Sequence, residues 1–374
     1  MSTSKLIGEE AFSKAYGFKD VLKLRKPNTR DIVRRLGVLS PHRIHISDYP
    51  AGHPAAVFNA SVDIEGDIAH IYARIVVGYY MYASAIVRID VPIDDIIYGY
   101  VNINYYSAEP EILPSTKYDI WGVEDPRVYR INEKTVVTYT GRTVNYFNPA
   151  IRRERTLPIT AVRIQDGKWK EHWHRVMAHT LPSELREKLI SDKDAFLVIT
   201  NSNVYIFHRP HLTDEYYYLT VSKVDGEKVL RIIENPDKEL IEVESRDTIW
   251  VMPHTDFEVK LGWATPPIRL DAKRVVALIH AVDSVKKVYR VFAVQLSLEK
   301  EGVVVEAVTP NYIMEPREPY EVYGDRPYVV FPCGLAKLGR NEILITYGAA
   351  DYMVGVGTLD LEELLAELDK GRIY

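Results

Sequence analysis

Short apolar segments alternate with polar turns along the chain, and one such segment recurs at an almost constant spacing. Nine-residue segments rich in β-branched and aromatic residues begin at Asp67, Lys134, Ser202, Arg274 and Glu342. Their starts are 67, 68, 72 and 68 residues apart. Each segment lies at or just after a turn-rich stretch, so each is predicted to be the second strand of a hairpin.

A second strand-like run follows in every repeat and ends at an acidic position. These runs end at Asp90, Asp166, Asp225, Glu299 and Glu362. A five-fold repeat built from strands is typical of a five-bladed β-propeller, in which four-stranded sheets surround an axis. We therefore predict an all-β fold in which residues 1–374 form one closed propeller domain. Chance similarity among hydrophobic strands is the alternative, and the regular spacing argues against it.

Helical patterns are few and lie outside the repeats. Residues 19–36 are compatible with short helices broken at Pro27, and Ser183 is a candidate cap for another short helix. Residues 360–370 have the amphipathic pattern of a helix. We expect short helical additions at both ends of an otherwise β framework.

Both ends of the chain are expected to decorate the propeller rather than to form domains. Residues 1–50 are predicted to be an N-terminal extension, and 360–374 a C-terminal helix packed on the propeller. The C-terminal helix has an apolar stripe that must be covered, formed by Leu361, Leu364, Leu365 and Leu368. Packing on the propeller is favoured, while coverage by a second subunit keeps a homo-oligomer open.

Charge and cysteine content narrow the possible partners and location. The 47 Lys and Arg residues are outnumbered by 52 Asp and Glu residues, a net charge of -5 that does not suit nucleic-acid binding. The single cysteine, Cys333, excludes an intrachain disulfide and a multi-cysteine zinc site. Charges interrupt every apolar window, so neither a signal peptide nor a membrane span is expected. We predict a cytoplasmic protein without a membrane partner.

Charged side chains stand at the ends of the repeated strands. In a propeller, equivalent positions on different blades point toward one end of the axis, so these side chains are expected to line a single polar funnel. Each alone is compatible with an ordinary surface charge, but five repeats with the same feature favour a shared site. The residues are Arg74, Arg142, His208 with Arg209, His280 with Asp283, and Asp351.

The segment GVEDPRVYR, residues 122–130, is the most distinctive local feature. Pro126 biases the backbone of Asp125 toward extended conformations, and Arg127 is able to pair with Glu124 or Asp125. This arrangement predicts an oriented acid, and an ordinary turn with an exposed salt bridge is the alternative. Phosphate-binding glycine loops, serine nucleophile elbows, HExxH and dinucleotide fingerprints do not occur in the sequence. We therefore expect no cofactor and no metal.

Several further motifs occur in order at compatible spacing, and with them the sequence resembles glycoside hydrolase family 130 over nearly its whole length. Members of this family are largely β-mannoside phosphorylases built on five-bladed propellers. The motifs are VFN (57–59), Arg74, GVEDPRV (122–128), YTGR (139–142), KDA (193–195), HRP (208–210), PPI (266–268), the strand of His280, PYEVYG (319–324), VVFPCG (329–334) and YGAAD (347–351).

The resemblance implies a role for each candidate residue. Asp125 matches the catalytic acid that protonates the departing glycosidic oxygen, through a hydroxyl of the bound mannose. A phosphate dianion needs several positive donors and is already a nucleophile once positioned. The implied phosphate-binding residues are Arg142, Lys193 and His208. The implied substrate-binding residues are Asn59, Arg74 and Asp351, with His280 in the same cavity.

The expected activity is that of an inverting glycoside phosphorylase. It would cleave a terminal β-mannoside with inorganic phosphate as co-substrate and release α-mannose 1-phosphate. One alternative is an inverting β-mannosidase, which needs a second carboxylate about 6.5–9.5 Å from the acid; Glu315, Glu318 and Glu321 are the candidates. Another alternative is a carbohydrate-binding propeller without catalysis.

One departure from the family pattern limits the prediction. The family usually has a longer segment with a Pro-Glu-Lys element between the lysine and the HRP motif. Here residues 193–210 connect the two without that element. A shorter connection is able to move Lys193 or to open the part of the site that binds the acceptor sugar. The glycosidic linkage and the acceptor sugar are therefore not predicted. Tyr139, Tyr320 and Tyr347 are candidates for stacking on sugar faces, and core packing is an equal alternative for each.

Overall fold

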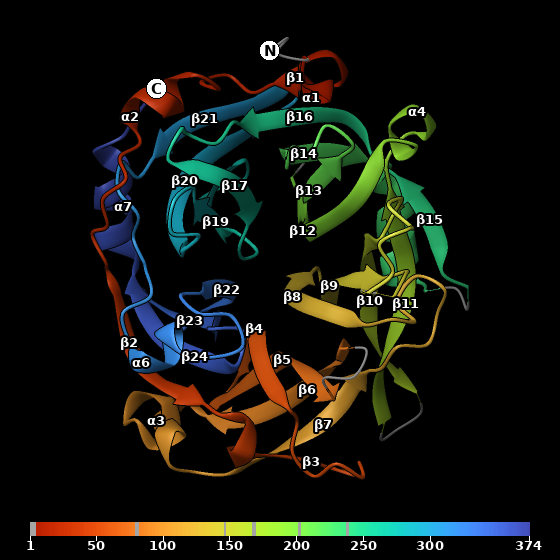
Figure 1. Ribbon diagram of the computed structural model, residues 1–374, viewed down its shortest axis with the longest axis vertical. Coiled ribbons are helices and arrows are strands. Elements are labelled where there is room, and N and C mark those ends of the chain that lie inside the picture. Colours follow the sequence, from red (N-terminus) through yellow and green to blue (C-terminus); the bar gives the residue numbers. More distant parts are fainter. Residues whose placement is uncertain (1–4, 79–81, 146, 167–169, 201–202, 237–238) are drawn as a thin grey trace.

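Five sheets form a ring around a central axis in the computed structural model, which describes residues 5–78, 82–145, 147–166, 170–200, 203–236 and 239–374 (Figure 1). The first strand of each sheet faces the axis, and later strands lie progressively outward. The predicted five-bladed β-propeller is confirmed.

Each sheet is built mainly from antiparallel strands close together in the chain, and four of the five gain an edge strand from an earlier or later part of the chain. The first sheet contains β4 (Ala56–Glu65), β5 (Ile68–Gly78), β6 (Ala83–Pro92), β7 (Tyr106–Ile112) and β3 (Ile44–Ile46). The second contains β8 (Val123–Ile131), β9 (Lys134–Arg142), β10 (Thr156–Asp166), β11 (Lys170–Thr180) and β15 (Ile241–Glu244). The third contains β12 (Leu189–Ile199), β13 (Val204–Leu212), β14 (Leu219–Val224), β16 (Arg246–Met252) and β1 (Ser13–Lys14).

The last two sheets complete the ring. The fourth contains β17 (Glu258–Trp263), β19 (Arg274–Asp283), β20 (Tyr289–Glu299) and β21 (Gly302–Val308), and β18 (Ile268–Arg269) pairs with β19. The fifth contains β22 (Val330–Lys337), β23 (Glu342–Ala349), β24 (Met353–Asp360) and β2 (Val33–Leu39).

The repeated segments of the sequence are the second strands of the five sheets, as predicted. They form β5, β9, β13, β19 and β23, and each pairs antiparallel with the first strand of its own sheet. The runs that follow them form the third strands β6, β10, β14, β20 and β24. Ser202, the first residue of one repeated segment, lies outside the described residues.

The N-terminal segment joins three different sheets. Strand β1 extends the third sheet, β2 the fifth and β3 the first. The helical expectation for 19–36 is correct only at its start, where α2 (Asp20–Leu24) ends before Pro27. Val33–Leu39 is instead a strand that pairs antiparallel with β24. Three of its seven residues are buried, because pairing with a sheet edge offers it partners that a lone helix would lack.

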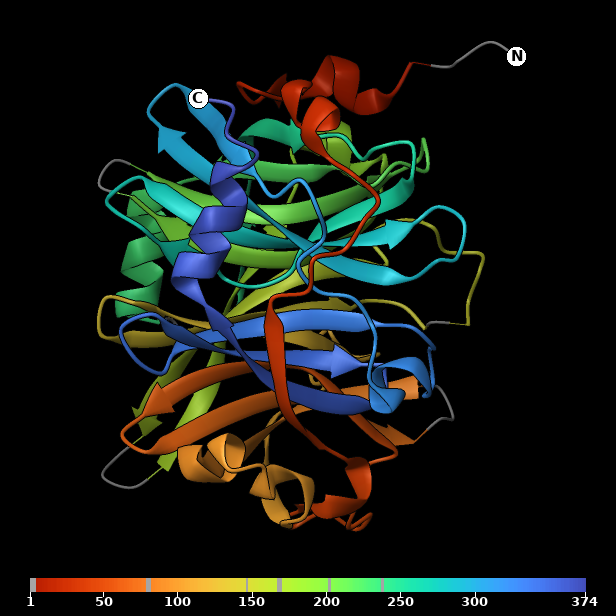
Figure 2. The same cartoon turned by 90° about the vertical axis from the view of Figure 1, so that its left-hand side faces the viewer.

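The remaining helices are short and lie outside the ring of strands (Figures 1 and 2). Ser183 is the first residue of α4 and not its cap, since Pro182 holds the cap position. Among the helices, α7 is capped by Asp360, whose side chain accepts a hydrogen bond from the Glu363 N–H. The helices are α1 (Ile7–Ala11), α2, α3 (Ile93–Ile97), α4 (Ser183–Arg186), α5 (Gly226–Glu234), α6 (Pro319–Val322) and α7 (Leu361–Asp369), with 3-10 turns η1 (Pro41–Arg43) and η3 (Tyr100–Asn102).

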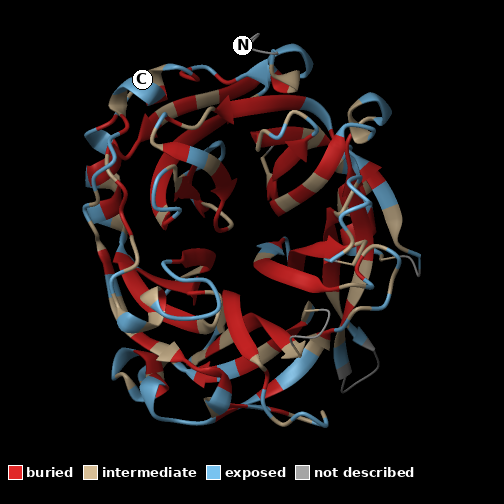
Figure 3. Ribbon diagram, in the orientation of Figure 1, coloured by how far each residue is buried: buried red, intermediate tan, exposed pale blue. Residues whose placement is uncertain are grey.

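The C-terminal helix covers its apolar stripe on the propeller itself. Leu364 and Leu368 are fully buried and belong to a hydrophobic cluster with residues of the fourth and fifth sheets. Burial is concentrated in the strands, and exposed residues lie mainly in the outer loops and helices (Figure 3). None of the helices in the described part of the chain combines the length and apolar character that a membrane span requires.

Candidate active site

Three of the innermost strands share one irregularity near the same end of the ring. Asn59 in β4, Asp125 in β8 and Asp194 in β12 have φ values of 48°, 51° and 57°. Strand pairing shifts register at each of these positions. Asn and Asp tolerate this left-handed conformation better than most residues, and a bulge re-aims side chains. The extended backbone expected for Asp125 before proline is therefore wrong, because the bulge determines its conformation.

The bulges border a cavity of about 430 Å³ at this end of the axis, called the central cavity here. It gathers five of the eight predicted site residues: Asn59, Arg74, Asp125, Lys193 and Asp351. Arg209, expected from the sequence in the polar funnel, also lines the cavity. The other lining residues were not assigned a role from the sequence: Phe58, Tyr82, Glu124, Phe147, Asp194, Lys260, Tyr289, Asp325, Arg326, Val329 and Phe331.

Asp125 is held by neighbours from the first sheet. Its Oδ1 accepts hydrogen bonds from Asn59 Nδ2 at 2.8 Å and from Arg74 Nη1 at 3.1 Å. Asn59 and Arg74 come from the paired strands β4 and β5, so the first sheet positions the acid of the second. Asp125 itself lines the central cavity.

Arg127 supports the bulge from behind and does not pair with the carboxylate of Glu124 or Asp125. Its Nη1 donates to the main-chain carbonyl oxygen of Asp125 at 2.7 Å, and its Nη2 lies 3.3 Å from Asp194 Oδ1. Its Nε donates to the carbonyl oxygen of Ala264 at 3.1 Å. The guanidinium group thus links β8, β12 and the end of β17.

Glu124 is the centre of a buried cluster of charges that the sequence did not reveal. Its Oε1 accepts a hydrogen bond from Arg74 Nη2 at 2.9 Å and lies 3.5 Å from Arg142 Nη1, while its Oε2 accepts from Lys193 Nζ at 2.9 Å. Burial alone would raise the pKa of Glu124, but the charges of Arg74, Lys193 and Arg142 lower that pKa to about 2. Glu124 is therefore ionised at neutral pH and gathers the three cations beside Asp125.

Asp351 follows β23 in the chain and also lines the central cavity. Burial raises its pKa to about 6, and the positive charges of Arg74 and Arg326 reduce the increase. Asp325, next to Arg326, accepts a hydrogen bond from the hydroxyl of Tyr82 at 2.6 Å. The first and fifth sheets thus contribute polar groups to one wall.

A second cavity of about 730 Å³ adjoins the central cavity and is called the cationic annex here. Lys193 and Phe147 line both cavities, while Arg142 lines the annex. Arg142 and Lys193, both predicted to bind phosphate, therefore meet at the boundary between the two. The annex wall consists of Arg142, Val144, Phe147, Pro149, Arg152, Arg155, Thr156, Ile190, Ser191, Lys193, His211 and Tyr217.

His208 is not among the described residues that line either cavity, which corrects the position expected for it. Its Nδ1 is 2.7 Å from Asp192 Oδ2 and its Nε2 is 2.7 Å from Ser222 Oγ. Both ring nitrogens are thus engaged within the third sheet. The following residue, Arg209, lines the central cavity, and its Nε lies 2.9 Å from Asp194 Oδ2.

His280 also lies behind the cavity wall rather than in it. The side chain is fully buried, with Nε2 3.3 Å from Asp194 Oδ2 and its ring centroid 4.4 Å from that of Phe331. Asp194 and Phe331 both line the central cavity. Burial lowers the pKa of His280, so its imidazole is neutral at neutral pH and supports two wall residues.

The three tyrosines considered for sugar stacking pack elsewhere. Tyr139 donates to Asp119 Oδ2 at 2.7 Å, Tyr347 donates to Glu321 Oε1 at 2.7 Å, and the Tyr320 hydroxyl is 3.5 Å from that of Tyr347. Other aromatic side chains line the central cavity in their place: Phe58, Tyr82, Phe147, Tyr289 and Phe331.

The glutamates proposed as a hydrolytic base are also engaged elsewhere, and none is among the described residues lining the central cavity. Glu321 is buried and accepts from Arg35 Nε at 2.9 Å as well as from Tyr347. Glu315 lies 3.1 Å from Arg290 Nε, and Glu318 forms a capping box with Glu321 at the start of α6.

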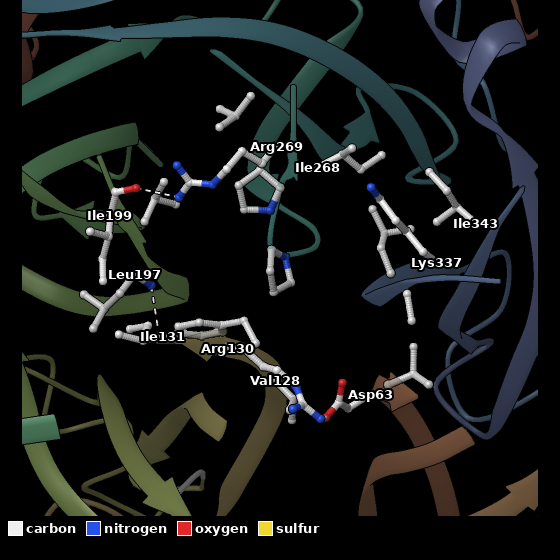
Figure 4. A pocket seen from close by; sticks show the side chains of 18 of the residues that line it. Asp63, Val128, Arg130, Ile131, Leu197, Ile199, Ile268, Arg269, Lys337 and Ile343 are labelled. Carbon is white, nitrogen blue, oxygen red and sulfur yellow. Dashed lines mark hydrogen bonds and ion pairs between the residues drawn. The ribbon is translucent and has the colours of Figure 1, made fainter. Parts of the chain in front are cut away.

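A third cavity, of about 730 Å³, lies where the innermost strands end, and its chemistry differs (Figure 4). Its wall is largely apolar, with Val128, Leu197 and Ile268 among its residues. Arg130 pairs there with Asp63 at 2.8 Å, and the PPI motif lines the same cavity. The predicted site residues all lie away from this end.

The side chains of the described residues offer no group of three or more His, Cys, Asp or Glu that could hold a metal ion. Three carboxylates of the central cavity, those of Glu124, Asp125 and Asp194, are instead paired with guanidinium or ammonium groups. Binding of an oxyanion and a polyhydroxylated ligand suits this mixture of donors and aromatic surfaces.

Comparisons with known proteins identify the family. Residues 23–370 match the sequence model of glycoside hydrolase family 130, described as β-1,4-mannooligosaccharide phosphorylase. A β-1,2-mannobiose phosphorylase and a 1,2-β-oligomannan phosphorylase, both from Thermoanaerobacter sp. (strain X514), are 26% and 25% identical and cover 87% and 83% of this chain and 96% and 92% of their own lengths.

Solved structures show the same fold. A β-1,2-mannobiose phosphorylase from Listeria innocua, in complex with β-1,2-mannobiose, has a TM-score of 0.66 at 16% identity and covers 90% of this chain and 99% of its own. A mannose phosphorylase from Leishmania mexicana, in complex with a phosphate ion, has a TM-score of 0.55 at 13% identity and covers 92% of each chain. With the family sequence model matched over most of its length, the chain belongs to glycoside hydrolase family 130, a family of glycoside phosphorylases that act on β-mannosides.

Proposed function

We propose that this protein is an inverting phosphorylase that cleaves a terminal β-mannoside with inorganic phosphate and releases α-mannose 1-phosphate. The observation that carries this proposal is the position of Asp125 beside the cluster of cations around Glu124. Arg74 contacts both carboxylates, at 3.1 Å and 2.9 Å. Arg142 lies near the same Glu124 oxygen as Arg74, and Lys193 contacts the other one. One acid therefore lies next to several cations that are able to hold phosphate.

The charges of this cluster suit a bound anion. Arg74, Arg142 and Lys193 face the two carboxylates of Glu124 and Asp125, so one positive charge is in excess. A phosphate dianion adds two negative charges and reverses the balance. Glu124 is held ionised by its partners. Asp125, which lines the cavity beside it, is the proposed donor of the proton that the leaving group needs.

Asp125 would donate this proton to the departing glycosidic oxygen through a hydroxyl of the bound mannose. Asn59 and Arg74 hold its Oδ1 and thereby fix the carboxylate in the cavity wall. General acids of this kind contribute about 10²–10⁴-fold to the rate. Asn59, Arg74 and Asp351 would also contact hydroxyls of the mannosyl unit, and the aromatic side chains of the cavity would cover its apolar faces.

Phosphate would replace the base that an inverting hydrolase needs. Arg142 and Lys193 would hold it, without His208, whose ring nitrogens are engaged by Asp192 and Ser222. Hydrolysis instead requires a carboxylate that accepts a proton from water. Glu124 has a pKa of about 2 and is a poor base at neutral pH. The pKa of Asp194 is lowered as well by Arg209, His280 and Arg127, which outweigh burial.

The test is cleavage of β-mannobioses of defined linkage and of mannosyl-glucose, with and without phosphate. We expect a sugar phosphate only when phosphate is present, and almost no free mannose without it. In Arg142→Gln and Lys193→Gln the KM for phosphate should rise at least about 10-fold, the loss expected from one charge-assisted contact. Arg340→Gln, a change of the same charge at an exposed site, is the control.

Equal release of free mannose with and without phosphate would contradict phosphorolysis and favour a mannosidase. Sugar binding without turnover, unchanged in Asp125→Asn, would favour a carbohydrate-binding propeller. Testing several linkages in parallel also identifies the acceptor side of the substrate.

A further inference from the structure

The charged residues in the wall of the cationic annex are all basic. Of its twelve described lining residues, five are Arg, Lys or His and none is Asp or Glu. The chain as a whole has the opposite balance, a net charge of -5. A cavity whose charges have one sign raises the local concentration of oppositely charged ligands and their association rates. The annex therefore favours the binding of anions, although the protein as a whole is acidic.

The annex leads directly to the cations proposed to hold phosphate. Lys193 lines both cavities, and Arg142 extends from the annex to within 3.5 Å of Glu124. Tyr217 also lines the annex, and its ring lies beneath Arg209 and Lys260, each 5.1 Å from the ring centroid. Arg209 and Lys260 belong to the central cavity. Positive charge is thus continuous from one cavity to the other.

Two arginines of the outer annex are placed to receive an anion. Arg152 pairs with Glu215, and both side chains are exposed, by 60% and 59%. Exposed ion pairs contribute little to stability because water screens them. An incoming phosphate dianion is therefore able to compete with Glu215 for Arg152. Arg155 donates to the main-chain carbonyl oxygens of Asn148 at 2.6 Å and Ile151 at 2.5 Å, which fixes its guanidinium group in the annex wall.

We infer that the cationic annex is a second oxyanion site, which binds inorganic phosphate before it reaches Arg142 and Lys193. Arg152 and Arg155 hold the waiting phosphate there. This inference rests on the proposed function, because phosphate is the co-substrate in that proposal. A phosphate group carried by a sugar has the same chemistry, and the experiment below separates the two sources.

Titration calorimetry with inorganic phosphate, in the absence of sugar, counts the sites. The wild-type protein should bind two phosphates, and Arg142→Gln should keep one of them. In Arg152→Gln and Arg155→Gln the affinity of the annex site should fall about 10-fold, the effect of one charge-assisted contact. Arg340→Gln, exposed and remote from both cavities, should match the wild type. Because Arg152 is exposed, its variant tests the site even if Arg155→Gln does not fold.

Kinetics give a second reading. In Arg152→Gln, kcat/KM for phosphate should fall about 3- to 10-fold and depend less on salt concentration. The kcat should be unchanged, since the annex affects the arrival of phosphate and not the chemical step. A single phosphate in the wild type, or an Arg152→Gln variant indistinguishable from Arg340→Gln, would overturn the inference while leaving phosphorolysis intact. Displacement of the annex phosphate by mannose 6-phosphate but not by mannose would overturn its assignment to inorganic phosphate. Two bound phosphates without phosphorolysis would support the site and contradict only the proposed function.

Discussion

Arg127 Nη1 donates to the main-chain carbonyl oxygen of Asp125 at 2.7 Å, while the carboxylate of Asp125 is held by other residues. Asp125 has a φ of 51°, a conformation that costs of order 1 kcal/mol or more for a non-glycine residue and persists only when its surroundings fix it. The buried guanidinium of Arg127, which also contacts Asp194 and Ala264, provides that support. It acts as a positioning residue for the acid.

Replacement of Arg127 should therefore misplace Asp125 without removing a contact to the substrate. In Arg127→Lys we expect kcat to fall about 10- to 100-fold, the scale of an ångström-sized misplacement, with KM for the mannoside nearly unchanged. Steady-state kinetics measure this split. Arg35→Lys is the matched control, because Arg35 is also a buried arginine paired with two carboxylates, Asp31 and Glu321. A rise in KM alone, or equal losses in both variants, would argue against positioning.

Asp125→Asn removes the proposed acid and keeps its shape. We expect kcat/KM for phosphorolysis to fall about 10²–10⁴-fold, the contribution of a general acid. Mannoside binding, measured by calorimetry, should change much less, since the amide still has an oxygen to accept from Asn59 and Arg74. An aryl β-mannoside with an acidic leaving group should recover most of the rate. Failure of such a substrate to do so would argue against proton donation by Asp125.

Glu124→Gln leaves Arg74, Arg142 and Lys193 without their shared carboxylate. Breaking a buried pair of this kind costs roughly 3–5 kcal/mol, so the melting temperature in phosphate-free buffer should fall. Phosphate supplies the missing negative charge, so its addition should raise the melting temperature of the variant more than that of the wild type. Differential scanning fluorimetry measures both effects. Glu342→Gln, at an exposed site, serves as the control, and an equal phosphate response in all three proteins would contradict the cluster's role.

Asp351 should make the folded protein less stable as pH rises. Its pKa is about 6 when folded and near 3.8 in its ordinary state, so the folded chain holds more protons between these values. Stability is therefore lost as pH rises from about 4 to 6, and the loss is complete above the folded pKa. Asp351→Asn removes this titration. The free energy of unfolding of the variant, minus that of the wild type, should therefore be on the order of 1–3 kcal/mol larger above pH 6 than at pH 4.

Urea unfolding at pH 4, 6 and 8 measures that change. Asp256→Asn, at an exposed aspartate, should show no comparable dependence on pH. A constant difference between Asp351→Asn and the wild type over this range would show that Asp351 has an ordinary pKa.

The sequence repeat was sufficient to predict the propeller because all five second strands are apolar and evenly spaced. The N-terminal strand β2 was not predicted, since its pairing with β24 joins residues more than 300 positions apart (Val33 with Leu359). Its mixed charged and apolar sequence does not distinguish a helix from an edge strand. Only the closed ring supplies the partner that makes it a strand.

The site was predicted in part, and the errors have one physical cause. Adjacent residues on a strand point to opposite faces, so His208 and Arg209 were not distinguishable without the register. Arg209 faces the cavity and His208 faces away. The bulges at Asn59, Asp125 and Asp194 shift the register again. Asn or Asp recurs in VFN, EDP and KDA, and this repetition is the signal that could have identified Asp194 as a wall residue.

Proton NMR of the reaction with a β-mannobiose and inorganic phosphate tests the central claim most directly, since it identifies the first product and its anomeric configuration. We expect α-mannose 1-phosphate to form from the start in the wild type and to be lost in both Asp125→Asn and Arg142→Gln. Free mannose as the first product, or β-mannose 1-phosphate, would contradict inverting attack by a phosphate held beside Asp125.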